Sequence, residues 1–532
     1  MKKRVLCLLL CLLTLLCVVL TGCSQGEDIN TDSNVNSSRT PVTLNMWIIS
    51  ENQISEETEK AVENAFNAIT EATYTTHVDL IFCTAEEYEA RLDAKFATID
   101  AKPAGTSIKP PTKAETYVDE DGMTVLKYPT ASEYQLDILL IAGEEMLSKY
   151  VAEGRLTSLD ESLVNQYRVI SSYVYNDVMD NAKVNGSWYA VPNNNVIGSY
   201  TYMLVNRAMA EKYYYNESDF TSFGLNTAAA QLIEKIAKNE DRSVIAPMYG
   251  MADYPLAKYW SKNGDAPSII STLYLSANEG IGNGVSAVNL FKDAGYKTFM
   301  QEMFHCKENG YFRDQQETFG VAIMEGDYSV YQQYIDDYYV VPLAYPRLEE
   351  DAVFGSMFAV STSTASLARS MEIIKELTCR SELRNVLQYG VEDVHYRLDD
   401  DGVLHRLNRD YMMNIRYTGN VLMAHPEEGM SADAWNNAIL QNRESLVSKV
   451  FGSGSFLSRV DADAWNQMSE ISVAYFDRLY RCETGSEFEE YLRVAAREIE
   501  SSSYYAKMVG TDETTLNGAL AKWWMETFGS KA

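Results

Sequence analysis

The sequence predicts an α/β protein with two lobes. Strand and helix patterns alternate through residues 42–156, as in a mostly parallel sheet with helices on both faces. About 490 residues follow residue 40, which is too many for one ordinary hydrophobic core. The pattern changes between residues 200 and 345, and roughly the last 90 residues are helical in pattern. We therefore expect each lobe to be a mixed, mostly parallel sheet flanked by helices, with a helical C-terminal region.

The first 22 residues have the layout of a secretory signal peptide. Positive residues 2–4 precede an apolar run from Val5 to Leu20. This run of roughly 16 residues is shorter than the about 20 that a membrane-spanning helix needs, and a transmembrane anchor is the alternative. The stretch Leu20-Thr21-Gly22-Cys23 resembles the lipobox of bacterial lipoproteins, in which the cysteine becomes the lipid-bearing N-terminus.

A polar linker follows the cysteine. Residues 24–40 have no aromatic side chain and consist mainly of Ser, Asn, Asp, Thr and Gly, so they cannot bury enough surface to fold. As a flexible coil they would span roughly 20–25 Å. We expect residues 1–22 to be removed, Cys23 to carry the lipid, and residues 23–40 to tether the folded body to the extracytoplasmic face of the cell membrane.

The elements of the first lobe follow in order. The expected strands are residues 42–48, 77–82 and 136–143, and the expected helices are residues 55–73, 85–98 and 144–156. Residues 100–133 interrupt this alternation with a Pro-, Gly- and Lys-rich stretch and an Asp-Gly hairpin. We expect a surface flap there, and a lid over a cleft is the alternative.

The middle and end of the chain supply the remaining elements. The expected strands are residues 200–206, 243–250 and 338–347, the expected helices are residues 227–239, 297–310 and 366–390, and a second Asp-Gly hairpin is expected at residues 396–407. Gly390 is a plausible cap for the helix that it ends. We expect residues 41–195 and 355–450 to form the first lobe, and residues 196–354 and 451–532 to form the second.

Charge and cysteine content exclude several classes of partner. Without the leader the chain carries 42 basic and 75 acidic residues, a formal charge of −33. Such a charge argues against nucleic acid and against adhesion to anionic lipid. The four later cysteines have no metal-type spacing, and isolated cysteines at apolar positions more often act as small buried hydrophobes; they are Cys83, Cys306, Cys379 and Cys482.

The order of the motifs resembles a known family. "VTLNMW", "DILLIAGEEMLSKYVAEGRLTSLDESL", "VNGSWYAVPNN", "YTYMLVNRAMAEKY" and "FGVAIMEGDYSV" follow the lipobox in turn. The chain is similar in this order to the extracellular solute-binding lipoproteins of bacterial ABC importers, in particular the large carbohydrate-type, family 1-like group. "QYGVEDVHYRLDDDG" looks like a segment of a related subgroup, which often has Gly where this chain has Asp393.

The resemblance implies a fold and a function. It implies the type II periplasmic-binding-protein-like fold, with two lobes that close on a solute by hinge bending. The solute, an oligosaccharide by this resemblance, would then pass to the transmembrane subunits of a permease, with no catalysis, cofactor or metal. We expect a monomer. The alternatives are a peptide-binding receptor lipoprotein and, further away, a secreted glycoside-active enzyme.

Candidate ligand-binding residues lie at predicted strand ends, because open α/β sheets bind ligands beyond the carboxyl ends of their strands. They are Trp47, Gly143, Glu144, Asn193, Asn194 and Asn195. An indole offers a flat apolar face and one donor, and asparagine amides offer paired donors and acceptors to hydroxyl groups. A core tryptophan and a ligand-free asparagine turn are the plain structural alternatives.

Further candidates are aromatic or acidic. Tyr259, Trp260 and Tyr328 are possible stacking residues, although a chain with 36 tyrosines must use most of them elsewhere. Glu51 and Asp327, like Glu144, could accept hydrogen bonds from sugar hydroxyls, and a solvated acidic surface explains them equally well.

Motifs of the common hydrolases are missing from the sequence. No G-x-S-x-G elbow, H-E-x-x-H pair or P-loop occurs, and the five histidines have no metal-ligand spacing. A glycosidase needs two carboxylates at a set separation, and 75 acidic residues make such a pair impossible to exclude by counting. The sequence therefore favours a binding protein over an enzyme.

Overall fold

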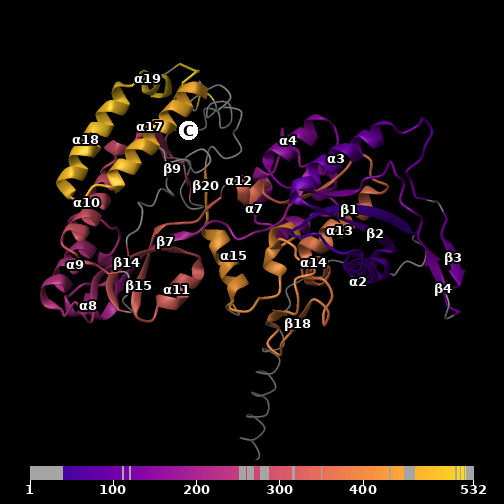
Figure 1. The fold of residues 1–532 in the computed structure, drawn as a ribbon, viewed down its shortest axis with the longest axis horizontal. Helices are drawn as coiled ribbons and strands as arrows, with labels where there is room; N and C mark the ends of the chain where they lie inside the picture. The colour runs from indigo at the N-terminus through magenta and orange to yellow at the C-terminus, as the bar shows by residue number, and fades with distance from the viewer. Residues whose placement is uncertain are drawn as a thin grey trace, which may run out of the picture.

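A computed structural model of the chain has two lobes placed end to end (Figure 1). It describes residues 40–110, 113–118, 122–250, 259–260, 269–272, 274–275, 287–313, 318–348, 350–430, 433–448, 462–509, 512–515, 517–519 and 522. The predicted leader, Cys23 and nearly all of the predicted linker lie outside these residues. No helix within them is both long and apolar enough to cross a bilayer.

The first lobe is built on a five-stranded sheet in the order β2-β1-β5-β17-β6. Its strands are β1 (Val42–Ser50), β2 (Thr76–Thr84), β5 (Ile138–Ile141), β6 (Ala190–Pro192) and β17 (Met357–Val360). β1 runs parallel to β2 and β5, whereas β17 runs antiparallel to β5 and β6. The sheet is therefore mixed, and its fourth strand comes from far along the chain.

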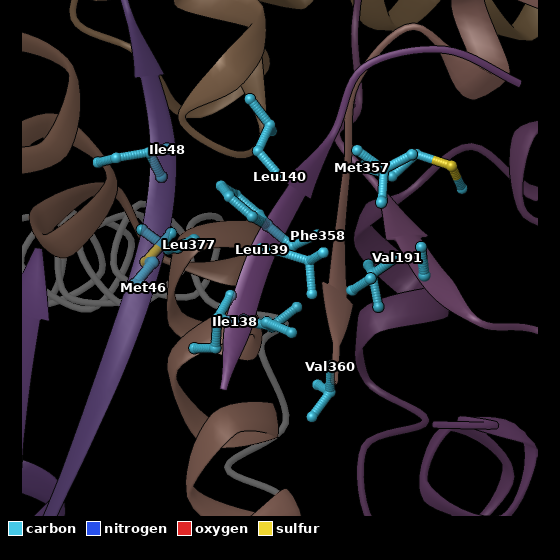
Figure 2. Close-up of a cluster of buried hydrophobic side chains, with 14 of the residues drawn as sticks. Met46, Ile48, Ile138, Leu139, Leu140, Val191, Met357, Phe358, Val360 and Leu377 are labelled. Carbon is cyan, nitrogen blue, oxygen red and sulfur yellow. The ribbon is translucent and has the colours of Figure 1, made fainter. Parts of the chain in front are cut away.

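Helices cover the faces of this sheet. They include α2 (Glu56–Tyr74), α3 (Ala85–Asp100), α4 (Glu144–Ala152), α13 (Leu367–Cys379) and α14 (Ser381–Tyr389), with the shorter α5 (Asp160–Val164), α6 (Ile170–Tyr173), α7 (Asn176–Asn181) and α12 (Glu350–Phe354). Figure 2 shows the centre of the core, where Ile138 and Leu139 of β5 lie beside Phe358 and Val360 of β17. Every residue of β1 is buried, because a strand covered on both faces has no polar side.

The second lobe is built on another five-stranded sheet, in the order β13-β8-β14-β7-β15. Its strands are β7 (Tyr200–Asn206), β8 (Ala246–Tyr249), β13 (Phe312–Arg313), β14 (Phe319–Gly326) and β15 (Tyr338–Ala344). β8 runs parallel to β13 and β14, whereas β7 runs antiparallel to β14 and β15. The two sheets therefore share one pattern of strand directions.

The helices of the second lobe come from the middle and the end of the chain. They are α8 (Arg207–Lys212), α9 (Ala228–Asn239), α10 (Ala294–Glu308), α11 (Tyr328–Tyr334), α17 (Ala462–Tyr480), α18 (Gly485–Ser501) and α19 (Ser503–Val509). α18 packs against α10, so the C-terminal helices extend the core of this lobe.

Shorter elements complete the described fold. Small sheets are formed by β9 (Tyr259–Trp260), β10 (Ile269–Thr272) and β12 (Ala287–Asn289), and by β11 (Tyr274–Leu275), β16 (Arg347–Leu348) and β20 (Leu446–Ser448); β18 (Tyr396–Leu398) pairs with β19 (Leu404–Arg406), and α15 is Ala434–Glu444. The 3₁₀ turns are η1 (Glu217–Asp219), η4 (Leu290–Lys292), η5 (Ile415–Tyr417) and η6 (Val421–Met423).

The predicted flap contains the expected hairpin. β3 (Glu115–Val118) pairs antiparallel with β4 (Thr124–Lys127), and its side chains are almost all exposed. The hairpin projects from the end of the first lobe that is farther from the second lobe (Figure 1). This position favours a surface flap over a lid between the lobes.

Two predicted boundaries were wrong. β1 continues to Ser50, so Trp47 lies inside the strand instead of ending it. The single helix expected at residues 366–390 is two helices, because Arg380 has an extended backbone between α13 and α14. Gly390 does end α14, with a φ of 80° that suits glycine. Asp393 has a φ of 61°, a left-handed backbone that glycine adopts more readily than aspartate.

Candidate functional site

The carboxyl ends of β1 and β5 lie on the same side of the first sheet, because the two strands are parallel. We call this side, where the strands end, the first edge. β17 runs the other way and places Met357 opposite Ile141, and Pro192 of β6 lies opposite Met357. The residues just beyond this edge therefore come from four separate segments; they are Glu51, Gly143, Glu144, Ser356 and Asn193. Four loops distant in sequence meet at the place where such sheets bind ligands.

The second sheet has a matching side where strands end or begin, which we call the second edge. Gly326, the last residue of β14, lies opposite Tyr200, the first residue of β7. Ala344, the last residue of β15, lies opposite Thr201. Asp327 and Tyr328 follow directly from this edge, and Tyr345 follows β15.

Three segments of the described chain cross between the two lobes. The first (residues 193–199) runs from β6 to β7, the second (residues 345–348 and 350–356) lies between β15 and β17, and the third (residues 445–448) follows α15. The second and third pair with each other, since the Leu446 N–H donates to the Pro346 carbonyl at 2.7 Å. The first two crossing segments start and finish at the two edges described above, so both edges lie at the junction of the lobes.

The first-lobe candidates differ in whether they lie in the core or at the first edge. Trp47 is buried in the core, with the Arg91 guanidinium 5.7 Å from its ring centre, so the core interpretation describes it better. Glu51 is exposed just past β1, and its N–H donates to the Met412 carbonyl at 3.0 Å. Gly143 caps α4 with a φ of 121°, a backbone that few other residues adopt, and Glu144 is half-buried beside it.

The three asparagines are buried at the start of the first crossing segment. The Asn193 amide donates to Ser356 Oγ at 2.6 Å and to the Arg416 carbonyl at 3.0 Å. Asn194 donates to the Tyr173 carbonyl, and Asn195 donates to the Asn193 carbonyl at 2.9 Å. Their donors therefore hold the junction together, whereas Oδ1 of Asn193 and Oδ1 of Asn195 accept no hydrogen bond from the described residues.

The second-lobe candidates are divided between two sheets. Asp327 caps α11 by accepting from the Ser329 N–H at 2.8 Å, and Tyr328 is half-buried next to it. Tyr259 and Trp260 instead form β9, which pairs with β10 in a small separate sheet, and their side chains lie outside the described residues. The edge of the five-stranded sheet thus includes Asp327 and Tyr328 but neither residue of β9.

Tyrosines gather at the second edge, and most of them are not among the candidates predicted from sequence. The Tyr200 ring stacks on Tyr202 with centres 4.8 Å apart, and Tyr345 lies 5.9 Å from Tyr200. Tyr328 lies 5.2 Å from Tyr331 on α11. We call these five residues the tyrosine cluster. The sequence carries one signal for this cluster: Tyr200 is the first residue of β7, and Tyr345 directly follows β15.

One carboxylate interacts with the tyrosine cluster. The Tyr200 hydroxyl donates to Glu444 at 2.5 Å. Burial, followed by this hydrogen bond, raises the pKa of Tyr200 far above its usual value, so the hydroxyl stays protonated. Tyr345 is 39% exposed, so part of its ring is available to a ligand. The cluster can offer aromatic faces and hydroxyl donors at the same place.

A cation lies at the first edge. Arg416 Nη2 lies 2.7 Å from the Asp351 carboxylate in the second crossing segment. Gly355 is required beside this pair, because a Cβ there would come within 2.5 Å of Asp351 oxygens. Arg416 could not be predicted from sequence, since an isolated arginine in a loop carries no pattern.

One group of residues has the composition of a metal site. Ligand atoms of Glu63, His77 and Asp79 lie within 4.8 Å of one another. Burial lowers the pKa of His77, but its hydrogen bonds to Asp79 and Glu71 outweigh burial and raise the pKa to about 9. A protonated imidazole already balances these carboxylates, and the group lies at the beginning of β2, at the opposite end of the strands from the candidate edge.

Comparison with known proteins identifies the fold. No protein-family model and no curated protein matches the chain. Among solved structures, the N-glycan transport solute binding protein NgtS of Streptococcus pneumoniae is 17% identical, with 93% of this chain and 100% of that one covered and a TM-score of 0.54. This chain has the fold of a solute-binding protein. The match confirms the predicted two-lobe α/β architecture.

Two further structures with this solute-binding-protein fold are similar at lower scores. An ABC-transporter-associated solute-binding protein of Bifidobacterium longum infantis, described as HMO-binding, is 11% identical, covers 91% of this chain and 99% of its own, and has a TM-score of 0.45. A family 1 extracellular solute-binding protein of Alicyclobacillus acidocaldarius is also 11% identical, with coverage of 87% and 100% and a TM-score of 0.42.

Proposed function

We propose that the protein is the substrate-binding lipoprotein of an ABC importer and that it captures an oligosaccharide between its two lobes. The observation that carries this proposal is the pair of sheet edges at the lobe junction, one polar and one lined with tyrosines. Sugar rings have apolar faces that stack on aromatic rings, and their hydroxyl groups need dense hydrogen-bonding partners. The fold supports the same function, since the neighbour from Streptococcus pneumoniae is described as an N-glycan transport protein.

In this proposal the two edges contribute different interactions with the solute. The tyrosine cluster would stack against sugar rings, with Tyr345 as its exposed member. Glu51 and Asp327 would accept hydrogen bonds from hydroxyl groups, because both are exposed next to a sheet edge. Closure about the crossing segments would bring the two sets of groups onto one solute, which would then be released to the permease.

A thermal-shift screen tests the proposal. Mannose- and N-acetylglucosamine-containing oligosaccharides, the matching monosaccharides, and peptides of three to five residues are the probes. A solute at 100 times its Kd should stabilise the protein by about 2.7 kcal/mol through mass action. A shift with oligosaccharides supports the proposal, whereas a shift with peptides alone replaces the solute class. No turnover of glycoside substrates is expected, and hydrolysis of any would contradict the non-catalytic function.

Membrane attachment is the second part of the proposal. It rests on the lipobox-like stretch that ends at Cys23 and on the polar residues that follow it. Radiolabelled palmitate should be incorporated into the wild-type protein in cells but not into Cys23→Ser. Release of the variant into the medium or periplasm should accompany this loss. Equal labelling of both proteins would contradict lipidation at Cys23.

A further inference from the structure

A polar helix lies between the two lobes. α15 contacts α11 of the second lobe and η6 of the first (Figure 1). Its sequence, AWNNAILQNRE, is rich in amides and has the composition of a solvated helix. Yet Asn437, Gln441 and Asn442 are all buried, and the exposed fraction of Gln441 is 0%. Buried amides need hydrogen-bonding partners, so the partners of these three residues show what the helix holds.

Gln441 joins the first crossing segment to the second lobe. Its Nε2 donates to the carbonyls of Ile197 and Gly198 at 2.9 and 2.6 Å. Its Oε1 accepts from the N–H of Tyr328 at 3.1 Å, at the first residue of α11. One buried side chain thus fixes both the chain that enters β7 and a member of the tyrosine cluster.

Asn442, the next residue along α15, also hydrogen-bonds to the first crossing segment. Its Nδ2 donates to the Asn195 carbonyl, and its Oδ1 accepts from the Ile197 N–H, both at 2.8 Å. Asn437 exchanges a pair of hydrogen bonds with Gln332 of α11, at 2.7 and 3.1 Å. On the other side, the backbone at Gly198 lies close to the second crossing segment, since a Cβ there would lie 3.0 Å from the Arg347 backbone nitrogen.

We infer that Gln441 and Asn442 form a clasp that sets the angle between the lobes and thereby positions Tyr328 and Asn195 for the solute. The backbone groups at residues 195–198 lie outside any sheet, and the amides of the clasp replace the partners that a strand would provide. Without the clasp these groups would need water, and the first crossing segment would sample more conformations. Gln441 and Asn442 are positioning residues, and they act through the backbone that they hold.

A matched variant separates the positioning function of Gln441 from its contribution to the stability of the folded protein. Gln388 on α14 is as buried as Gln441, donates to the Met413 carbonyl at 2.7 Å and accepts from the Thr418 hydroxyl at 2.6 Å. All of its partners belong to the first lobe. Gln441→Leu and Gln388→Leu remove the same chemistry at similar burial, but only Gln441→Leu opens the clasp.

The test measures the distance between the lobes in the absence of solute. Spin labels at Ala90→Cys on α3 and Glu211→Cys on α8, two exposed positions, report on one lobe each. Cys7→Ser, Cys11→Ser, Cys17→Ser, Cys23→Ser and Cys379→Ala in every variant prevent labelling elsewhere, because Cys83, Cys306 and Cys482 are buried. The distance distribution should broaden or shift in Gln441→Leu and stay as in the wild type in Gln388→Leu, although both variants melt at lower temperature. Equal distance distributions in the wild type, Gln441→Leu and Gln388→Leu would overturn the inference that the clasp sets the angle between the lobes.

Solute affinity gives a second readout, which rests on the proposed function. With the oligosaccharide that gives the largest thermal shift, Gln441→Leu should change Kd by about 5-fold or more, because a changed lobe equilibrium changes apparent affinity. Gln388→Leu should leave Kd unchanged. The absence of any binding saccharide would overturn the proposed function but not the clasp, which the distance measurement tests on its own. An unchanged Kd in Gln441→Leu would show that the clasp does not position the site.

Discussion

The two five-stranded sheets have the same order of parallel and antiparallel neighbours, but their edges at the lobe junction have opposite chemistry. The edge of the first lobe consists of amides, backbone groups and charges such as Asn193 and Arg416. The edge of the second lobe consists of stacked rings such as Tyr200 and Tyr202. The difference shows that one backbone pattern can carry two sets of side chains, with amides and charges at the first edge and aromatic rings with hydroxyl groups at the second.

The largest expected effect comes from breaking one lobe while keeping the other. Phe358 lies fully buried on β17, between β5 and β6. Phe358→Ala should lower the free energy of unfolding of the first lobe by about 3–5 kcal/mol, because it leaves a cavity in a packed core. Hydrogen exchange by mass spectrometry should show lost protection in β5 and β6 but not in β7 and β14.

The control is the same change in the other lobe. Phe319→Ala on β14 removes a ring that is also buried. It should reverse the pattern of lost protection. If both variants lost protection throughout the chain, the two lobes would fold as one cooperative unit and the comparison would fail.

The second lobe has a buried acid that should make it sensitive to pH. Glu302 on α10 is 1% exposed, and burial raises its pKa to about 7. The folded state therefore keeps a proton that the unfolded state releases near pH 4.5, so stability falls as the pH rises from about 4.5 to about 7 and is constant above that. Glu302→Gln should remove this loss, which is about 3 kcal/mol for a pKa shift of this size. Urea denaturation at pH 4.5 and pH 8 measures the free energy of unfolding of both proteins. An equal change between the two pH values in the wild type and in Glu302→Gln would contradict the prediction.

The first lobe should lose stability in a higher pH window. The pKa of His77 is raised to about 9, so the contribution of the protonated imidazole is complete below its unfolded pKa near 6.5 and is lost as the pH rises through 9. Partial exposure reduces the effect to about 1–2 kcal/mol. His77→Gln should therefore be less stable than the wild type at pH 6 and equally stable at pH 10. A difference that does not change with pH would show a packing effect alone.

The smallest expected effect concerns the tyrosine edge. Tyr345→Ala should weaken oligosaccharide binding by about 10-fold, as expected for an aromatic anchor. Tyr214→Ala is the matched control, since Tyr214 is 94% exposed and follows α8, beyond the other end of β7. Isothermal titration should show unchanged affinity in the control. Equal loss in both variants would remove Tyr345 from the site.

The local elements were largely predictable from sequence. The strand at residues 42–48 and the helix that begins after Ser55 both carried clear signals, and the Ser55 hydroxyl does accept from the Thr58 N–H. The end of β1 was not predictable, because a strand buried on both faces lacks the alternation that would show where it stops. Trp47 was therefore placed at an edge that lies three residues further on.

The site was predictable only in part, because it depends on contacts between distant segments. Strand ends located Gly143 and Asn193 near the junction of the lobes, and Tyr328 was a candidate only as an aromatic residue. Nothing local shows that β17 lies between β5 and β6, since that placement depends on packing across more than 150 residues. α15 was equally hidden, because its buried amides have the composition of a helix that faces water.

The late position of β17 in the chain has a consequence for biosynthesis. The ribosome must make more than 350 residues before the strand that separates β5 from β6 exists. Until then β5 has one unpaired side and β6 has no strand to pair with in this sheet, whereas all five strands of the second sheet have already been made. The delay would keep the first lobe incompletely folded until most of the chain has been made. It also means that a fragment ending before Met357 would expose these unpaired strands and aggregate.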